Sequence, residues 1–207
     1  MREQLKTFVY AVLAGICIAI GGTVYLLIEN RVIGSALFTV GLFSICTLGL
    51  NLFTGKACYV FDRGVKFIPA LIIIWVGNLV GTFIIGQLEL FTRSGDALRA
   101  AAETIAATKL GDGLLSIFIL SILCNLLIYI AVENFAKNPH ELGKYLALFL
   151  GVMVFILCGF EHCVANMYYF TVAGAWSLRT LGYLCVMTLG NALGGVIIPL
   201  AKKAFEK

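Results

Sequence analysis

Charged residues are scarce in this sequence of 207 residues, where Asp, Glu, Lys and Arg together make up 13%. Soluble globular domains carry about 25% charged residues. Hydrophobic residues reach 61%, and the mean hydropathy is +1.00. This composition excludes an ordinary soluble domain. It predicts a single transmembrane domain over residues 1–207, with the lipid bilayer as its surroundings.

The sequence also lacks the patterns of common enzymes and metal sites. It has no Walker A loop, no nucleophile elbow and no HExxH motif. Glu161, His162 and Cys163 are consecutive, so on a helix their side chains would diverge and make a poor metal site. We therefore expect no enzymatic activity, no cofactor and no bound metal.

Further missing patterns narrow the possible functions and the possible roles of the cysteines. No basic patch interleaved with aromatic residues is present, so the net charge of +4 does not indicate a nucleic-acid partner. The seven cysteines include no CxxC pair and lie in or beside apolar stretches, so we interpret them as small buried hydrophobic residues. The first apolar run is longer than a signal peptide, so no cleavable leader is expected.

What is present is a series of apolar stretches long enough to cross a bilayer, which requires about 20 residues each. The predicted fold class is therefore an all-α membrane protein with a loop at 92–113 as its longest connection. The sequence predicts six spans, at residues 8–28, 33–60, 67–91, 114–135, 142–170 and 178–201.

Spans two and five are interrupted by polar, helix-breaking sequence at 51–56 and 159–166. Bilayer hydrocarbon offers no hydrogen-bond partners, so broken helices at membrane depth persist only where protein or a water-filled cavity surrounds them. We interpret the two interruptions as parts of a transport pathway.

The two halves of the chain resemble each other. The motif G-N-x-x-G-x-x-I-I occurs at 77–85 and again at 190–198. The repeats cover about 7–92 and 110–203, with three spans each. Because three is odd, the second repeat is predicted to be inverted, and inverted repeats with broken helices place a permeation site between the halves. The motif also favours close helix packing, and we expect it to serve that purpose as well.

Lys and Arg predict the orientation, because cytoplasmic loops carry an excess of them. The side of the termini collects nine, or ten with Lys56: Arg2, Lys6, Arg63, Lys66, Lys137, Lys144, Lys202, Lys203 and Lys207. The opposite side collects five: Arg31, Arg93, Arg99, Lys109 and Arg179. Both termini are therefore predicted to be cytoplasmic, in the inner (cell) membrane.

The interruptions contain the candidate site residues. His162 is either a core histidine or a pathway residue, and the matching polar break in span two favours the pathway. Glu161 is expected to accept hydrogen bonds from backbone amides freed by the break, or to lie at a subunit contact. Asn51 and Asn166 are expected to satisfy loose backbone groups. Lys56 either extends to the cytoplasmic face, which we prefer, or offers positive charge to a ligand.

Several segments resemble the formate/nitrite transporter family. They are G-F-E-H-C-V-A-N-M at 159–167, I-L-C-N-L at 122–126, L-F-T at 52–54 and A-T-K at 107–109. The resemblance covers nearly the whole chain in order. It implies an aquaporin-like fold of six spans, assembly as a homopentamer, and passage of small monovalent anions or their neutral acids, of the formate, nitrite and hydrosulfide class.

The resemblance also implies roles for individual residues. His162 corresponds to a central pore histidine and Thr54 to its hydroxyl partner. Lys109 and Asn125 fall where the family has a positive and a polar residue near the outer vestibule. Lys56 departs from the family, which commonly has an uncharged residue there. Five apolar residues fall where the family has two hydrophobic constrictions, namely Phe38, Leu42, Leu52, Phe53 and Phe155.

Other classes explain the sequence less well. An aquaporin-like channel for neutral small solutes would place Asn-Pro-Ala at paired half-helix ends, whereas Asn138-Pro139 lies in a charged connection. An enzyme would need convergent acid, base or metal groups. A scaffold has no reason to keep two polar breaks at matching depth. The sequence therefore predicts a passive or proton-linked channel or transporter for small monovalent anions, with the neutral-solute channel as the alternative.

Overall fold

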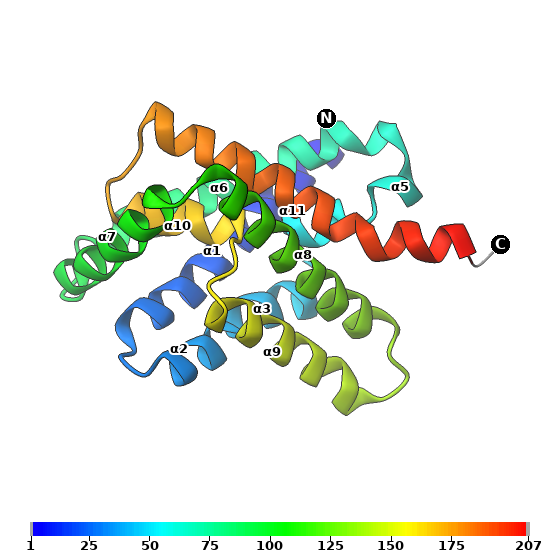
Figure 1. Ribbon diagram of the computed structural model, residues 1–207, viewed down its shortest axis with the longest axis horizontal. Helices are drawn as coiled ribbons and strands as arrows, with labels where there is room; N and C mark the ends of the chain where they lie inside the picture. Colours follow the sequence, from blue (N-terminus) through cyan, green and yellow to red (C-terminus); the bar gives the residue numbers. More distant parts are fainter. Residues whose placement is uncertain (1, 206–207) are drawn as a thin grey trace.

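A computed structural model describes residues 2–205 of the protein. These residues form helices joined by short connections (Figure 1). The long uninterrupted helices are α1 (Arg2–Leu27), α6 (Ile68–Glu89), α8 (Leu114–Lys137) and α11 (Leu178–Phe205). Lys207, one of the positive residues assigned to the cytoplasmic side, lies outside the described residues.

Five segments of the described chain are long and apolar enough to cross a membrane. Four are the helices α1, α6, α8 and α11, and the fifth is Arg31–Leu48. This last segment consists of α2 (Arg31–Phe38) and α3 (Val40–Leu48), separated at Thr39. The Thr39 hydroxyl donates to the Ala36 carbonyl at 2.6 Å, a back-bond that bends helices. The prediction of an all-α membrane protein is confirmed.

The predicted interruption of span two is present. After α3, Gly49 adopts a φ of 67°, a left-handed conformation that glycine accepts without steric cost. The chain remains unwound through Leu52 before becoming helical again. The short helices that follow are α4 (Phe53–Ala57), α5 (Val60–Arg63) and the 3₁₀ turn η1 (Val65–Phe67).

The predicted interruption of span five has the same construction. Helix α9 (Glu141–Leu157) ends before Gly159, which has a φ of 69°. An unwound stretch follows through His162, and α10 (Cys163–Val172) then begins. Each break is thus a helix, a left-handed glycine, an unwound stretch and a second helix.

The connection at 92–113 is not the loop that the sequence predicts. Helix α7 (Gly95–Gly111) fills most of it. Leu98, Ala102 and Ala106 recur every four residues and are buried, so they form one apolar face of this helix. That face packs on α10 and α1. The three arginines and lysines of the segment hid this periodicity.

The cysteines are only partly as predicted. Cys58, Cys124 and Cys163 are buried, whereas Cys158 and Cys185 are exposed on the single chain. Both exposed thiols lie on apolar membrane segments, where a residue facing lipid satisfies the same sequence pattern as a residue facing the core. The prediction of burial is therefore wrong for these two.

Glycines of the repeated motif bring pairs of helices together. Helix α1 packs along α6, and α8 packs along α11 (Figure 1). A Cβ atom at Gly81 would lie 2.1 Å from the Val12 carbonyl oxygen, and one at Gly194 would lie 2.1 Å from the Ile122 carbonyl oxygen. Only glycine permits such close backbone approach, as small-residue motifs do in membranes.

We expect Gly194→Ala to destabilise the protein, by about 1–3 kcal/mol for an overpacked site. Gly182→Ala is the matched control, since Gly182 lies in the same helix with nothing within 4 Å of its added Cβ. Alanine also favours helix by about 1 kcal/mol over glycine. Thermal unfolding in detergent measures both, and equal melting temperatures for the two variants would contradict the packing.

Candidate transport site

The two breaks meet at a pair of polar side chains. Thr54 comes from the first turn of α4, and His162 immediately precedes α10. The Thr54 Oγ1 atom lies 2.9 Å from His162 Nε2. His162 Nδ1 accepts the backbone N–H of Ala165 at 3.1 Å, so the imidazole caps α10. Both side chains are buried.

The cap fixes the protonation pattern of His162. An Nδ1 atom that accepts a hydrogen bond carries no hydrogen, so the neutral ring carries its hydrogen on Nε2. Nε2–H therefore donates to the Thr54 hydroxyl, and the threonine keeps its own hydrogen for another acceptor. A second proton, on Nδ1, would break the cap. The local structure thus favours a neutral imidazole that donates toward Thr54.

A cavity of about 390 Å³ lies beside the imidazole. We call it the histidine pocket. Its charged and ionisable side chains include Arg31, Lys109, Glu161 and His162. Lys109 Nζ lies 2.7 Å from Glu161 Oε2, and the Asn166 amide donates to the same oxygen at 2.6 Å. A buried carboxylate needs such partners to offset its loss of hydration.

Glu161 and Asn166 therefore differ from the predictions made for them. The Glu161 carboxylate binds side chains, Lys109 and Asn166, in place of the expected backbone amides. Asn166 binds this carboxylate and the Met187 sulfur in place of loose backbone groups. The sequence placed Lys109 in a loop, and it lies in the last turn of α7, which brings it to the carboxylate.

A second cavity, of about 290 Å³, is lined by Lys56. We call it the Lys56 pocket. It shares no lining residue with the histidine pocket. Leu42 and Leu52 line this second cavity together with Tyr59. Lys56 is half-buried there and has no ion-pair partner among residues 2–205.

Four of the five predicted constriction residues lie near these pockets. Phe155 lines the histidine pocket and stacks on His162, with ring centroids 5.5 Å apart and planes at 18°. Phe38 meets Phe155 edge to face at 6.1 Å. Leu42 and Leu52 line the Lys56 pocket, and all four are nearly fully buried.

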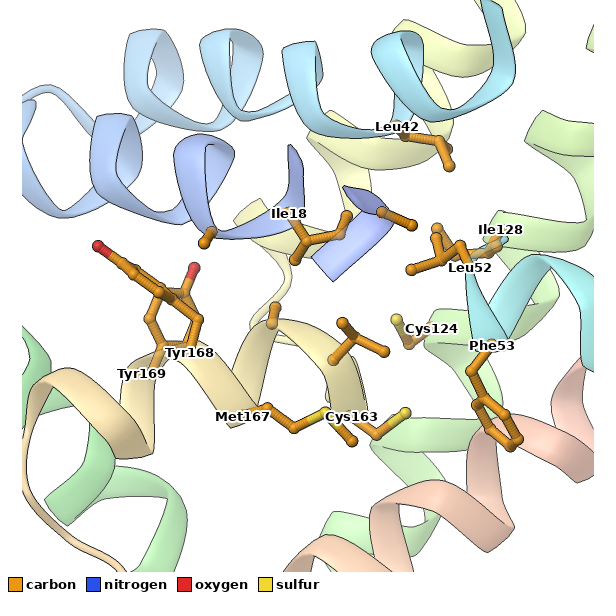
Figure 2. Packing of buried hydrophobic residues seen from close by; sticks show 14 of the residues in the cluster. Ile18, Leu42, Leu52, Phe53, Cys124, Ile128, Cys163, Met167, Tyr168 and Tyr169 are labelled. Carbon is orange, nitrogen blue, oxygen red and sulfur yellow. The ribbon is translucent and has the colours of Figure 1, made fainter. Parts of the chain in front are cut away.

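Phe53 lies apart from the other four. Figure 2 shows its ring turned away from Leu52 and toward α11. It lines an apolar hollow with Trp75 and other residues of α6 and α11. Leu52 and Phe53 are consecutive at a helix start, so their side chains diverge. Phe53 therefore lines neither the histidine pocket nor the Lys56 pocket in this structure.

Asn125 also lies apart from Lys109, its expected companion near the outer vestibule. It is fully buried in α8, and its Nδ2 donates to the Thr54 carbonyl at 3.1 Å and to the Asn191 carbonyl at 2.7 Å. Its Oδ1 has no hydrogen-bond partner in the described part of the chain. Asn125 therefore belongs with Thr54 at the junction of the breaks.

The residues that satisfy the loose backbone of the breaks are the asparagines of the repeated motif. Asn78 accepts the Phe53 N–H at 2.8 Å and donates to the Asn51 carbonyl at 2.9 Å. Its amide also donates to the Ala11 carbonyl at 2.8 Å. Asn51 contributes less, because its amide reaches only the Thr7 carbonyl of α1.

Asn191 makes the equivalent bonds at the second break. It accepts the Cys163 N–H at 2.8 Å and donates to the carbonyls of Glu161 and Ser121, each at 2.8 Å. The sequence predicted only a helix-packing role for this motif. The signal that could have identified its second role is a polar amide at the same place in both repeats, inside an apolar span.

The apolar helices, the two breaks and the buried polar junction define a multi-pass membrane protein. A family model described as "Formate/nitrite transporter" matches residues 1–202. The chain therefore belongs to the formate/nitrite transporter family.

Individual relatives agree with this membership. The chain is 29% identical to a probable formate transporter of Methanothermobacter thermautotrophicus, over 93% of this chain and 85% of that protein. It is 29% identical to the nitrite transporter NirC of Salmonella typhimurium, over 78% of this chain and 66% of the relative. A solved "Pentameric formate channel with formate bound" has the same fold, with a TM-score of 0.81, 24% identity and coverage of 99% and 98%.

We expect Asn191→Ala to destabilise the protein strongly. The change leaves the Cys163 N–H and the Glu161 carbonyl unpaired, each at a cost of about 1–3 kcal/mol when buried, and it also removes a bond to the Ser121 carbonyl of α8. Asn134→Ala is the control, because the Asn134 side chain bonds only within four residues of its own position. The readout is the melting temperature in detergent. A similar small loss in both variants would show that Asn191 does not hold the break.

Proposed function

We propose that this protein is a channel, without enzymatic activity, for small monovalent anions or their neutral acids, of the formate, nitrite and hydrosulfide class. The observation that carries the proposal is the contact between Thr54 and His162, which joins the two breaks beside the histidine pocket. Family membership supports the substrate class. The neutral-solute channel has no comparable support.

We propose the finer architecture as well: six spans in two inverted repeats, a homopentamer, and both termini on the cytoplasmic side of the inner membrane. The matching bonds of Asn78 and Asn191 support two equivalent halves. The pair α9 and α10, divided by the break at 159–162, supports an interrupted span five beside the five long apolar segments. The name of the pentameric formate channel supports the oligomeric state.

The mechanism follows from the cost of moving charge into apolar surroundings. A bare anion that leaves water for an apolar constriction loses many kcal/mol of hydration, and a neutral acid loses far less. Phe38 and Phe155 at the histidine pocket, and Leu42 and Leu52 at the Lys56 pocket, provide such apolar surroundings. An anion that loses water also becomes more basic. We propose that it takes a hydrogen ion from the bulk solution on the entry side, crosses as the neutral acid and releases that ion to the solution on the other side.

His162 then acts as a hydrogen-bond donor and not as the source of the proton. Its Nδ1 is occupied by the cap of α10, and its Nε2–H faces Thr54. A permeating oxygen or sulfur atom that replaces Thr54 as acceptor would be held at the junction. Asn125 Oδ1, which is without a protein partner within residues 2–205, is an acceptor for the acidic hydrogen of the neutral form.

We expect His162→Asn to reduce formate flux into liposomes by about tenfold. This factor corresponds to about 1.4 kcal/mol, the contribution of one lost hydrogen bond. Asparagine still caps a helix, so the fold is kept. The shape of the pH dependence should not change, because the proton comes from water. A changed shape would assign the proton transfer to His162, and an unchanged rate would remove it from the pathway. His140→Asn, at an exposed position, is the control.

We expect Phe155→Ala to admit larger anions such as lactate, because the change removes the ring that stacks on His162 and meets Phe38. Phe149→Ala, on the exposed face of the same helix, is the control. The measurement is the ratio of lactate flux to formate flux in liposomes. An unchanged ratio in the Phe155 variant would make this ring a packing residue only.

A further inference from the structure

The positive charge of Lys109 is already engaged inside the histidine pocket. Its ammonium group lies 2.7 Å from the Glu161 carboxylate, and 13% and 4% of the two side chains are exposed. Seen from any point a few ångströms away, the two opposite charges largely cancel. This pair therefore contributes little net attraction for an anion that approaches from water.

Arg31 leaves the histidine pocket with a net positive charge. It is the first residue of α2, it is exposed, and it lines this pocket. No carboxylate of residues 2–205 lies within ion-pair distance of its guanidinium. Its planar fork of donors matches the two oxygens of a carboxylate or nitrite. Arg31 is thus the cation of this pocket that no carboxylate of the described chain neutralises.

Within residues 2–205, Lys56 is likewise a cation without a carboxylate partner, in the Lys56 pocket. No acidic residue lines that cavity. The nearby Tyr59 hydroxyl donates to Glu133 at 2.7 Å, and this carboxylate is already paired with Lys137 at 2.7 Å. Lys56 itself has no carboxylate partner in the described chain. Its half-buried position beside Leu42 and Leu52 keeps the ammonium in a cavity with low-dielectric walls, which strengthens its field.

We propose that Arg31 and Lys56, one in each pocket, are the cations that capture the anion, and that Lys109 is a positioning residue for Glu161 and Asn166. This inference rests on the proposed function. It adds to that function an assignment of the charged residues that determine the affinity for the anion at each face of the protein. A passive pathway cannot change the final distribution of the anion, so each cation affects the concentration dependence measured from its own side and leaves the end point of the flux unchanged.

The test uses purified full-length protein in liposomes with one known orientation, and measures the KM for formate and for nitrite from each face. Arg31→Gln should raise KM from the side of the histidine pocket, and Lys56→Gln from the side of the Lys56 pocket, by about three- to tenfold in low salt. The increase should shrink at high ionic strength, where screening acts within about 10 Å. Arg31→Lys and Lys56→Arg keep the charge and should stay near the wild-type KM for each face.

Two controls remove exposed cations that line neither pocket. They are Arg93→Gln, between α6 and α7, and Lys66→Gln, in η1, and both should leave KM unchanged. The double variant Lys109→Met with Glu161→Gln removes the ion pair without changing the net charge. Its KM should rise less than that of Arg31→Gln, whatever happens to its maximal rate.

The outcomes separate the two proposals. A wild-type protein that moves neither anion would overturn the proposed function and this inference with it. A wild-type protein that moves them, with KM and its salt dependence unaltered in Arg31→Gln and Lys56→Gln, would overturn the inference alone. The inference would also be overturned if the charge-conserving variants were as impaired as the glutamine variants, because the shape of the side chain would then be the cause.

Discussion

The structure depends on one constraint: backbone amides and carbonyls that leave a helix inside a membrane must find partners within the protein. Two asparagines meet this constraint. Asn78 and Asn191 each accept one N–H from the start of a short helix and donate to carbonyls of the break and of a neighbouring helix. The breaks can therefore persist at buried positions, and the polar groups of Thr54 and His162 come to face each other between the two halves.

The same arrangement explains the protonation pattern of the site. An unwound stretch places His162 at the N-cap of α10, and the cap occupies Nδ1. The remaining nitrogen faces Thr54, while the Phe155 ring stacks on the imidazole and the Phe38 ring packs edge to face against Phe155. A polar contact in apolar surroundings is what a pathway needs if it is to favour a neutral acid over a bare anion. The charged side chains line the two pockets, and the histidine pocket lies beside this contact.

Much of the fold could be predicted from the sequence. The apolar runs identified the long helices, and the polar, helix-breaking sequence at 51–56 and 159–166 marked both breaks, because composition acts locally. Contacts between residues far apart in the sequence were harder to predict. The ion pair between Lys109 and Glu161 depends on helix α7, which brings the lysine to the carboxylate. The sequence did not reveal this helix, because the four-residue spacing of its buried Leu and Ala residues is masked by charged residues between them.

The direction of side chains at the breaks was also beyond the sequence. The turn from unwound chain to helix sends Leu52 and Phe53 to different sides, and no pattern of residue types records that turn (Figure 2). The second role of Asn78 and Asn191 was concealed for a related reason, since their motif is also a packing motif. Only the geometry of both breaks together reveals that the amides hold them.

The most direct measurement of the central claim is the rate at which formate or nitrite enters liposomes that contain the purified wild-type protein, down an imposed concentration gradient and beside protein-free liposomes. A pathway built on the two joined breaks predicts a rate well above that of the protein-free membrane, saturating with anion concentration. Equal rates with and without a correctly folded protein would contradict it.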